Sequence, residues 1–160
     1  MVSPLAQDTY FIATENFEAM YSEFENLYRE HYGEMRARLA ALGNEISPYN
    51  PRLDEYFRAS RGGYLLTFTA RCSGRPVGYA NVYVTNDMHN GDRIAQEDAL
   101  FVTKEHRKGV GRKLTLYGLD QLRQMGVSRL NVSAVTDTRA VSLWSRLGFR
   151  AVATEMVYQF

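Results

Sequence analysis

The 160-residue sequence is poor in cysteine and has little net charge. Cys72 is the single cysteine, so no disulfide can form within the chain, and a reducing compartment is the expected setting. The 19 Lys and Arg residues face 18 Asp and Glu residues, which gives a formal net charge of +1. A balanced charge provides no general attraction to nucleic acid, so any attraction to anions must be local.

Long hydrophobic runs are also missing. No stretch approaches the roughly 20 apolar residues that cross a bilayer. The opening "MVSPLAQDTYFIATENF" lacks the cationic and apolar regions of a secretion signal. Hydrophobic residues nevertheless make up 45% of the chain and charged residues 23%, which is typical of a globular protein. We therefore expect one cytoplasmic domain over residues 1–160, with neither a nucleic acid nor a membrane as partner.

The first part of the chain, residues 1–62, is predicted to be mainly helical. Apolar residues recur at intervals of three and four from Phe17 onward, which predicts a helical stripe. Thr14 is a candidate N-cap, Gly33 a candidate break between two helices, and Gly43 a candidate stop. A short helix is expected after Pro51.

The second part, residues 63–160, changes to strand-like patterns interrupted by helices. The expected elements are a hairpin around "CSGR", a strand at "IAQEDALFVT", a helix ending near Gly126, a short strand at "SRLNVSAV", a helix at "DTRAVSLWSRLG" and a final strand at "FRAVATEMVYQF". This order predicts an α/β fold in which helices flank a mixed, mostly antiparallel sheet.

The segment "HRKGVGRKL", residues 106–114, lies between the strand and the helix and carries the main chemical signal. It is no P-loop, and Leu114 stands where a dinucleotide fingerprint needs a third glycine. Gly109 and Gly111 lack a Cβ, so backbone N–H groups can approach an anion closely. The following helix adds the positive end of its dipole. The pattern predicts a cradle for a polyphosphate, and the alternative is a solvated basic turn.

Two motifs together, "ALFVTKEHRKGVGRKL" and "AVSLWSRLGF", resemble the coenzyme A signature and the C-terminal helix of the GNAT N-acetyltransferases. The resemblance covers roughly residues 65–160 and looks most like small phage- and prophage-encoded members. It implies acetyl-CoA as co-substrate, no metal, and residues 1–62 as a cover on the acceptor side. The implied cofactor contacts are Leu100, Phe101, Val102, His106, Arg107, Lys108, Gly109, Val110, Gly111, Arg112, Asp137 and Trp144.

The signature departs from the family pattern at three places. Its first Gln/Arg position falls on His106 when counted back from Gly109, and on Arg107 when counted forward from Val102. Asp137 stands where the family often has an asparagine. Trp144 replaces the tyrosine that protonates the leaving thiolate in many members, and an indole N–H does not transfer a proton at useful pH.

The predicted polyphosphate cradle, residues 106–114, is called the phosphate loop below. The resemblance implies a catalytic base on the strand before this loop. Glu97 and Asp98 are the candidates, and strand alternation puts them on opposite faces unless a bulge intervenes. We favour Glu97. His89, in the loop before this strand, is a further candidate because its ordinary pKa suits neutral pH. A backbone N–H of Leu100 or Phe101 is the expected oxyanion donor.

The implied activity is transfer of an acetyl group from acetyl-CoA to a primary amine within a ternary complex. The acceptor is a small molecule, or a lysine or N-terminus of a protein. The alternative is a GNAT-fold sensor or partner-binding module that binds acetyl-CoA without transferring it. A nucleic-acid-binding domain that uses the basic cluster over residues 104–113 is a third reading. The aromatic end "MVYQF" makes a homodimer conceivable.

Overall fold

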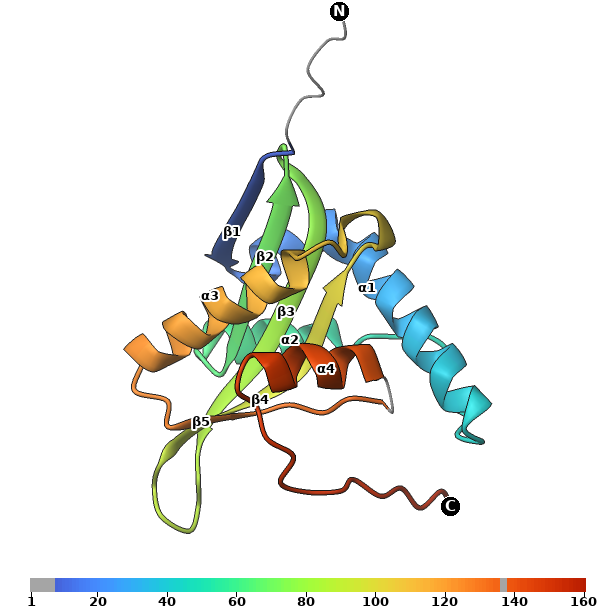
Figure 1. The fold of residues 1–160 in the computed structure, drawn as a ribbon, viewed down its shortest axis with the longest axis vertical. Helices are drawn as coiled ribbons and strands as arrows, with labels where there is room; N and C mark the ends of the chain where they lie inside the picture. The colour runs from blue at the N-terminus through green and yellow to red at the C-terminus, as the bar shows by residue number, and fades with distance from the viewer. Residues whose placement is uncertain (1–7, 136–137) are drawn as a thin grey trace, which may run out of the picture.

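A computed structural model describes residues 8–135 and 138–160, which form a single α/β domain (Figure 1). A five-stranded sheet has the order β1-β2-β3-β4-β5; its first four strands are antiparallel, and β5 is parallel to β4. The predicted fold class is confirmed. The strands are β1 (Tyr10–Glu15), β2 (Leu65–Cys72), β3 (Arg75–Asn86), β4 (Arg93–Val102) and β5 (Arg129–Asn131); the helices are α1 (Phe17–Ala41), α2 (Leu53–Arg61), the 3-10 turn η1 (Lys104–His106), α3 (Val110–Gln124) and α4 (Thr138–Arg146).

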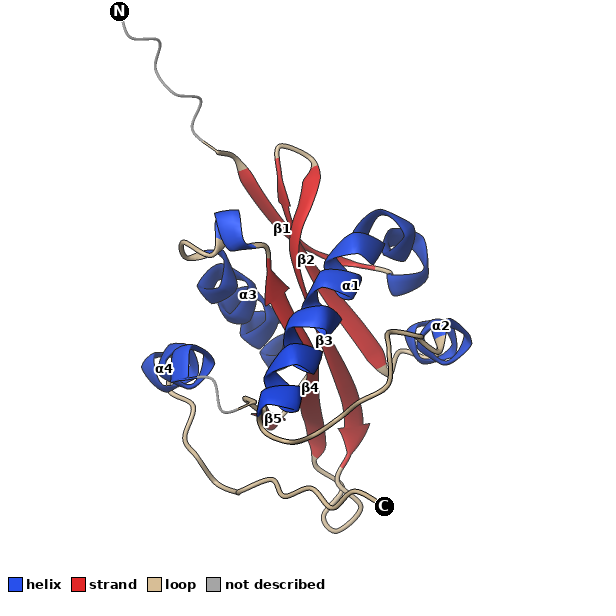
Figure 2. Cartoon of the chain, turned by 90° about the vertical axis from the view of Figure 1, so that its right-hand side faces the viewer, coloured by secondary structure: helices blue, strands red, loops and turns tan. Residues whose placement is uncertain are grey.

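The sheet separates two hydrophobic cores, because successive side chains of a strand point to opposite faces. Figure 2 shows α1 and α2 on one side of the sheet and α3 and α4 on the other. Phe24 of α1 packs in the first core with Tyr79 of β3, and Leu114 of α3 packs in the second with Phe68 of β2. No helix within the described ranges is long and apolar enough to cross a membrane.

The N-terminal region differs from the prediction at two points. A strand, β1, precedes the helices and pairs with β2, so Thr14 lies inside a strand. The N-cap of α1 is Asn16, whose Oδ1 accepts a hydrogen bond from the Ala19 N–H at 3.2 Å. Gly33 does not break α1, which runs for 25 residues, because a lone glycine weakens a well-packed helix without ending it.

The predicted final strand is wrong. Residues 149–160 contain no regular secondary structure, and the chain runs as a loop from α4 to the C-terminus (Figure 1). Met156, Tyr158 and Phe160 are exposed. The β-rich composition suggested a strand, but a strand needs a neighbour, and within the described residues β5 pairs only with β4.

Candidate active site

The edge of β4 that faces β5 is covered for only a short distance. The parallel ladder joins Ile94, Ala95 and Gln96 to Arg129, Leu130 and Asn131. From residue 97 to residue 102, no strand of the described chain pairs with this edge. A strand edge of this kind can accept an extended ligand through backbone hydrogen bonds. We refer to residues 97–102 as the open edge.

Backbone alternation identifies the groups that face the open edge. The Thr103 N–H donates to the Val77 carbonyl of β3 at 2.9 Å, so it points away from that edge. Peptide groups alternate along a strand, so the N–H and C=O of Leu100 and Val102 point toward the open edge, whereas the Phe101 N–H points to β3. The Val102 carbonyl already accepts a hydrogen bond from Arg107 Nε at 2.7 Å. Of the two predicted oxyanion donors, the alternation therefore favours Leu100.

A β-bulge in β4 lies at the two candidate carboxylates. Asn81 pairs with Ala99 while Val82 pairs with Glu97, so Asp98 is the extra residue. Glu97 lines a small cavity beside α3, and Asp98 lies on the other face, beside α2. The structure therefore places both carboxylates at the start of the open edge, but on opposite faces of the sheet.

Glu97 lies in apolar surroundings. Its cavity, of about 30 Å³, is bordered by Leu100, Leu114 and Val132 among others. Burial raises the pKa of Glu97 to about 7, the backbone N–H of Ser133 acts against this rise, and the charge of Asp98 adds to it. A carboxyl group with a pKa near 7 can accept a proton at neutral pH, and this is the property required of a general base.

Asp98 retains solvent exposure but is surrounded by phenol groups on the α2 side. Its Oδ2 accepts a hydrogen bond from the Tyr56 hydroxyl at 3.2 Å. Burial raises the pKa of Asp98, while hydrogen bonding from Tyr56 and Asn81 acts against this rise. Burial likewise raises the pKa of Tyr83 to about 12, with a further contribution from the negative charge of Asp98. This face therefore offers a carboxylate within an aromatic surface.

The side chain of Asn81 is buried beside the bulge. Its Oδ1 accepts hydrogen bonds from the Tyr28 hydroxyl at 3.1 Å and from Thr67 Oγ1 at 2.9 Å. Its Nδ2 has no aligned acceptor among the described residues, although it lies near enough to Asp98 to lower the pKa of that carboxyl group. Asn81 thus connects α1 and β2 to the acidic residue of the bulge. Sequence reasoning missed it, because an asparagine within a strand gives no signal of its own.

The phosphate loop has the geometry that its glycines predict. Gly109 adopts a φ of 94°, the left-handed region that other residues rarely enter, and it is the N-cap of α3. No side chain caps this helix, so the first N–H groups of α3, from Val110 to Arg112, have no partner within the helix. The exposed side chains of Lys108 and Arg112 add positive charge beside them. This arrangement suits a phosphate anion.

The two candidates for the first signature position both have protein partners. His106 Nδ1 lies 2.8 Å from the Tyr10 hydroxyl. Both oxygens of Glu34 in α1 accept hydrogen bonds from Arg107 Nη2, at 3.0 and 2.9 Å, and the guanidinium lies over the Phe101 ring. Arg107 therefore fixes the loop to α1 and to the end of β4, and it leaves phosphate contact to the backbone groups that follow.

Two predicted residues lie away from the open edge and from the loop before α3. His89 is exposed in the turn between β3 and β4, where its N–H donates to Asp87 Oδ1 at 2.8 Å, and the structure does not bring it to Glu97 or Asp98. Trp144 is only 7% exposed and packs near Phe149 at 6.2 Å between ring centroids, so it belongs to the core. Asp137 lies outside the described residues.

Comparison with known proteins agrees with this geometry. The sequence profile of the acetyltransferase (GNAT) family matches residues 17–149. No curated protein matches the chain by sequence. Two solved structures cover 95% of this chain: a ribosomal-protein-alanine N-acetyltransferase from Brucella melitensis biovar Abortus (19% identity, all of that chain, TM-score 0.73) and a glucosamine-6-phosphate N-acetyltransferase from Arabidopsis thaliana (15%, 99%, 0.67). An aminoglycoside N-acetyltransferase in complex with CoA covers 99% of both chains at 15% identity, with a TM-score of 0.72.

Proposed function

Because the chain belongs to the GNAT family of acetyltransferases, we propose that it moves an acetyl group from acetyl-CoA to a primary amine by direct transfer in a ternary complex. The observation that carries this proposal is the open edge of β4. It begins at two carboxylates and ends beside an uncapped helix N-terminus. One continuous stretch of backbone therefore provides an acid–base group, a surface for an extended ligand and an anion site, in the order in which acetyl-CoA needs them.

Backbone groups of the protein would bind the cofactor. The N–H and C=O of Leu100 face the open edge and would pair with amides of the pantetheine arm. The N–H groups from Lys108 to Arg112 would bind the pyrophosphate. Arg107 would hold the loop in place through Glu34.

The proposed transfer of the acetyl group uses Leu100, Glu97 and Asp98. The amine nitrogen attacks the thioester carbon, the Leu100 N–H stabilises the oxyanion, and the carbon–sulfur bond breaks to release the CoA thiolate. Glu97 accepts the proton of the amine, directly or through water. The thiolate takes its proton from solvent, because the buried Trp144 cannot supply one. We place Asp98 on the acceptor side, where its charge attracts the protonated amine before reaction.

The acceptor is proposed as an amine of a small molecule or of a protein. The surface around Asp98 contains Tyr56 and Tyr83, which offer apolar ring faces and polar hydroxyls. A carboxylate among phenol rings attracts a cation, so a protonated amine is favoured over a neutral acceptor. The likeness to phage-encoded members stays a prediction, as do the cytoplasmic location and the homodimer.

The first test is calorimetric titration of the protein with acetyl-CoA. We expect micromolar binding, which Gly109→Val should weaken at least tenfold, because valine cannot hold a φ of 94° without strain. Gly43→Val is the matched control: Gly43 has a φ of 81° and also lies in open space, but follows α1. Equal losses in both variants, or no binding by the wild type, would contradict the cradle.

A screen of primary amines then separates enzyme from sensor. Release of free CoA with any amine supports transfer. Tight acetyl-CoA binding without turnover on polyamines, aminoglycosides or peptides would favour the non-catalytic alternative, for which the absence of a phenol at Trp144 is the structural argument.

A further inference from the structure

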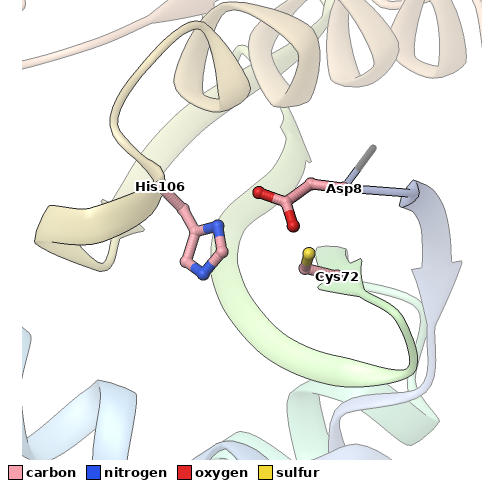
Figure 3. A group of neighbouring side chains, drawn as sticks. All are labelled: Asp8, Cys72 and His106. Carbon is pink, nitrogen blue, oxygen red and sulfur yellow. The ribbon is translucent and has the colours of Figure 1, made fainter. Parts of the chain in front are cut away.

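Three side chains that can bind metal meet beside the phosphate loop, away from the two carboxylates of β4. They are Asp8, which precedes β1, Cys72 at the end of β2, and His106 of η1. One oxygen, the sulfur and one ring nitrogen all lie within 4.8 Å of one another. Figure 3 shows the three side chains pointing into a common space, with a ring nitrogen of His106 turned toward the Asp8 carboxylate.

A fourth donor, the Tyr10 hydroxyl, lies at the same place. It is 2.8 Å from His106 Nδ1. Tyr10 also stands opposite Cys72 in the β1–β2 ladder and follows Asp8 by two residues. The four donors come from three places in the sequence, residues 8–10, Cys72 and His106, and only folding brings these together.

We propose that Asp8, Cys72 and His106 form a zinc site, with the Tyr10 hydroxyl as the fourth donor. Thiolate, imidazole and carboxylate are the ligands of Zn²⁺ in proteins, whereas Mg²⁺ and Ca²⁺ prefer oxygen alone. Tetrahedral zinc with bonds of about 2.0 to 2.3 Å separates its ligand atoms by about 3.3 to 3.8 Å. By comparison the observed group needs to contract by at most about 1.5 Å, and Asp8, which is exposed, can move.

Binding at this site requires deprotonation of the thiol. Zn²⁺ replaces the proton of Cys72, which passes to solvent, and the ion exchanges water for protein ligands. No electron is transferred. The ion would join the start of β1, the end of β2 and η1, and His106 lies only three residues before Gly109. The zinc site would therefore stabilise the segment that leads into the phosphate loop.

The test is titration of the reduced, tag-free full chain with Zn²⁺ in competition with a chromophoric chelator. We expect one ion per chain. Asp8→Asn and Cys72→Ser should each weaken binding at least tenfold, as the loss of a ligand does. Asp120→Asn, which changes another exposed aspartate, should bind as the wild type does. Asp8 is exposed, so its variant tests the site even if Cys72→Ser fails to fold.

Substitution with Co²⁺ identifies the ligands independently. A bound Co²⁺ ion should show a thiolate charge-transfer band together with the visible bands of tetrahedral coordination, and the first should vanish in Cys72→Ser. The proposal is overturned if the wild type binds no Zn²⁺, if Asp8→Asn binds as tightly as the wild type, or if the Co²⁺ spectrum lacks the thiolate band. None of these readouts depends on acetyl transfer, so failure here leaves the proposed function intact.

Discussion

Glu97 and Asp98 are neighbours in sequence but lie in different environments. Glu97 borders an apolar cavity on the α3 face, and Asp98 accepts a hydrogen bond from Tyr56 on the opposite face. The two side chains lie on opposite faces, as alternation along a strand predicts, and the bulge inserts Asp98 on the same face as Ala99. Each carboxylate can thus have its own task, and separate substitutions should have separate effects.

Replacement of Glu97 by glutamine should remove the acidic limb of the pH–rate profile. The pKa of Glu97 is about 7, so the wild-type carboxyl group is protonated below that pH and cannot act as a base. We expect kcat/KM of the wild type to fall as the pH drops below about 7. In Glu97→Gln we expect it to be lower by about 10² to 10⁴ and flat in this range. Steady-state kinetics across the pH range measures both.

Asp98→Asn is the matched comparison. It should raise KM for the amine and keep the acidic limb, because it leaves Glu97 in place. If Asp98→Asn abolishes the limb and Glu97→Gln keeps it, the two assignments are reversed.

The sequence predicts candidate site residues better than it predicts their surroundings. Gly109 and Gly111 stand out by their spacing between a strand and a helix, and the two carboxylates by their place in a segment that resembles the GNAT signature. The protein partners of His106 and Arg107, which are Tyr10 and Glu34, lie 96 and 73 residues away, and no local pattern reveals them. Asn81 is hidden for the same reason, since its three neighbours come from different elements.

At the scale of elements, tertiary pairing decides what local pattern leaves open. β1 and the tail over residues 149–160 both carry strand-like residues. β1 finds the edge of β2 and pairs over six residues, whereas the tail has no paired neighbour in the described chain. Composition could therefore not distinguish the strand that forms from the one that does not. The helices were predicted more accurately, because their hydrogen bonds are local.

A prediction at this scale concerns the contact between α3 and β2. Gly118 of α3 lies against Phe68, and a Cβ there would come within 3.0 Å of two ring carbons. Phe68 is 1% exposed and cannot move away freely. We expect Gly118→Ala to lower the free energy of unfolding by about 1 to 2 kcal/mol, since overpacking outweighs the gain in helix propensity.

Gly33→Ala is the opposite case and serves as control. A Cβ at Gly33 meets nothing within 4 Å, so this variant should gain up to about 1 kcal/mol from propensity alone. Chemical denaturation of both variants measures the difference. A stabilised Gly118→Ala variant would show that the α3–β2 contact has room to adjust.

At the scale of the whole molecule, α1 covers one face of the sheet and packs a partly buried histidine against it. His31 stacks on Phe101 of β4 at 5.1 Å between ring centroids, and its Nδ1 lies 2.8 Å from the Tyr79 hydroxyl. Burial lowers the pKa of His31 to about 4; Glu34 opposes this shift, and Arg38 and Arg107 add to it. The imidazole is therefore neutral in the folded protein at neutral pH.

This histidine should make the fold less stable in acid. Between pH of about 6.5 and 4 the unfolded chain binds a proton at His31 and the folded chain does not, so the free energy of unfolding falls as the pH falls. The slope from one such group is at most about 1.4 kcal/mol per pH unit. The difference in stability between the wild type and His31→Gln should shrink by about 1 to 2 kcal/mol from neutral pH to about pH 5.

Comparison of variants isolates this contribution. The raised pKa of Glu97 has the opposite effect on stability, but wild type and variant share it, so it cancels in the difference. Equal pH dependence in His31→Gln and the wild type would mean that His31 becomes protonated in the folded protein.

The extra residue in β4 has a consequence for how this protein can change. Because Asp98 and Glu97 lie on opposite faces of the sheet, mutations around Tyr56 and Tyr83 can reshape the acceptor surface without altering the apolar cavity around Glu97. Deletion of Asp98 would return β4 to simple alternation, with Glu97 still facing α3, and would remove the carboxylate from the α2 face. Selection for a new amine could thus act on one face while the reaction chemistry on the other is inherited unchanged.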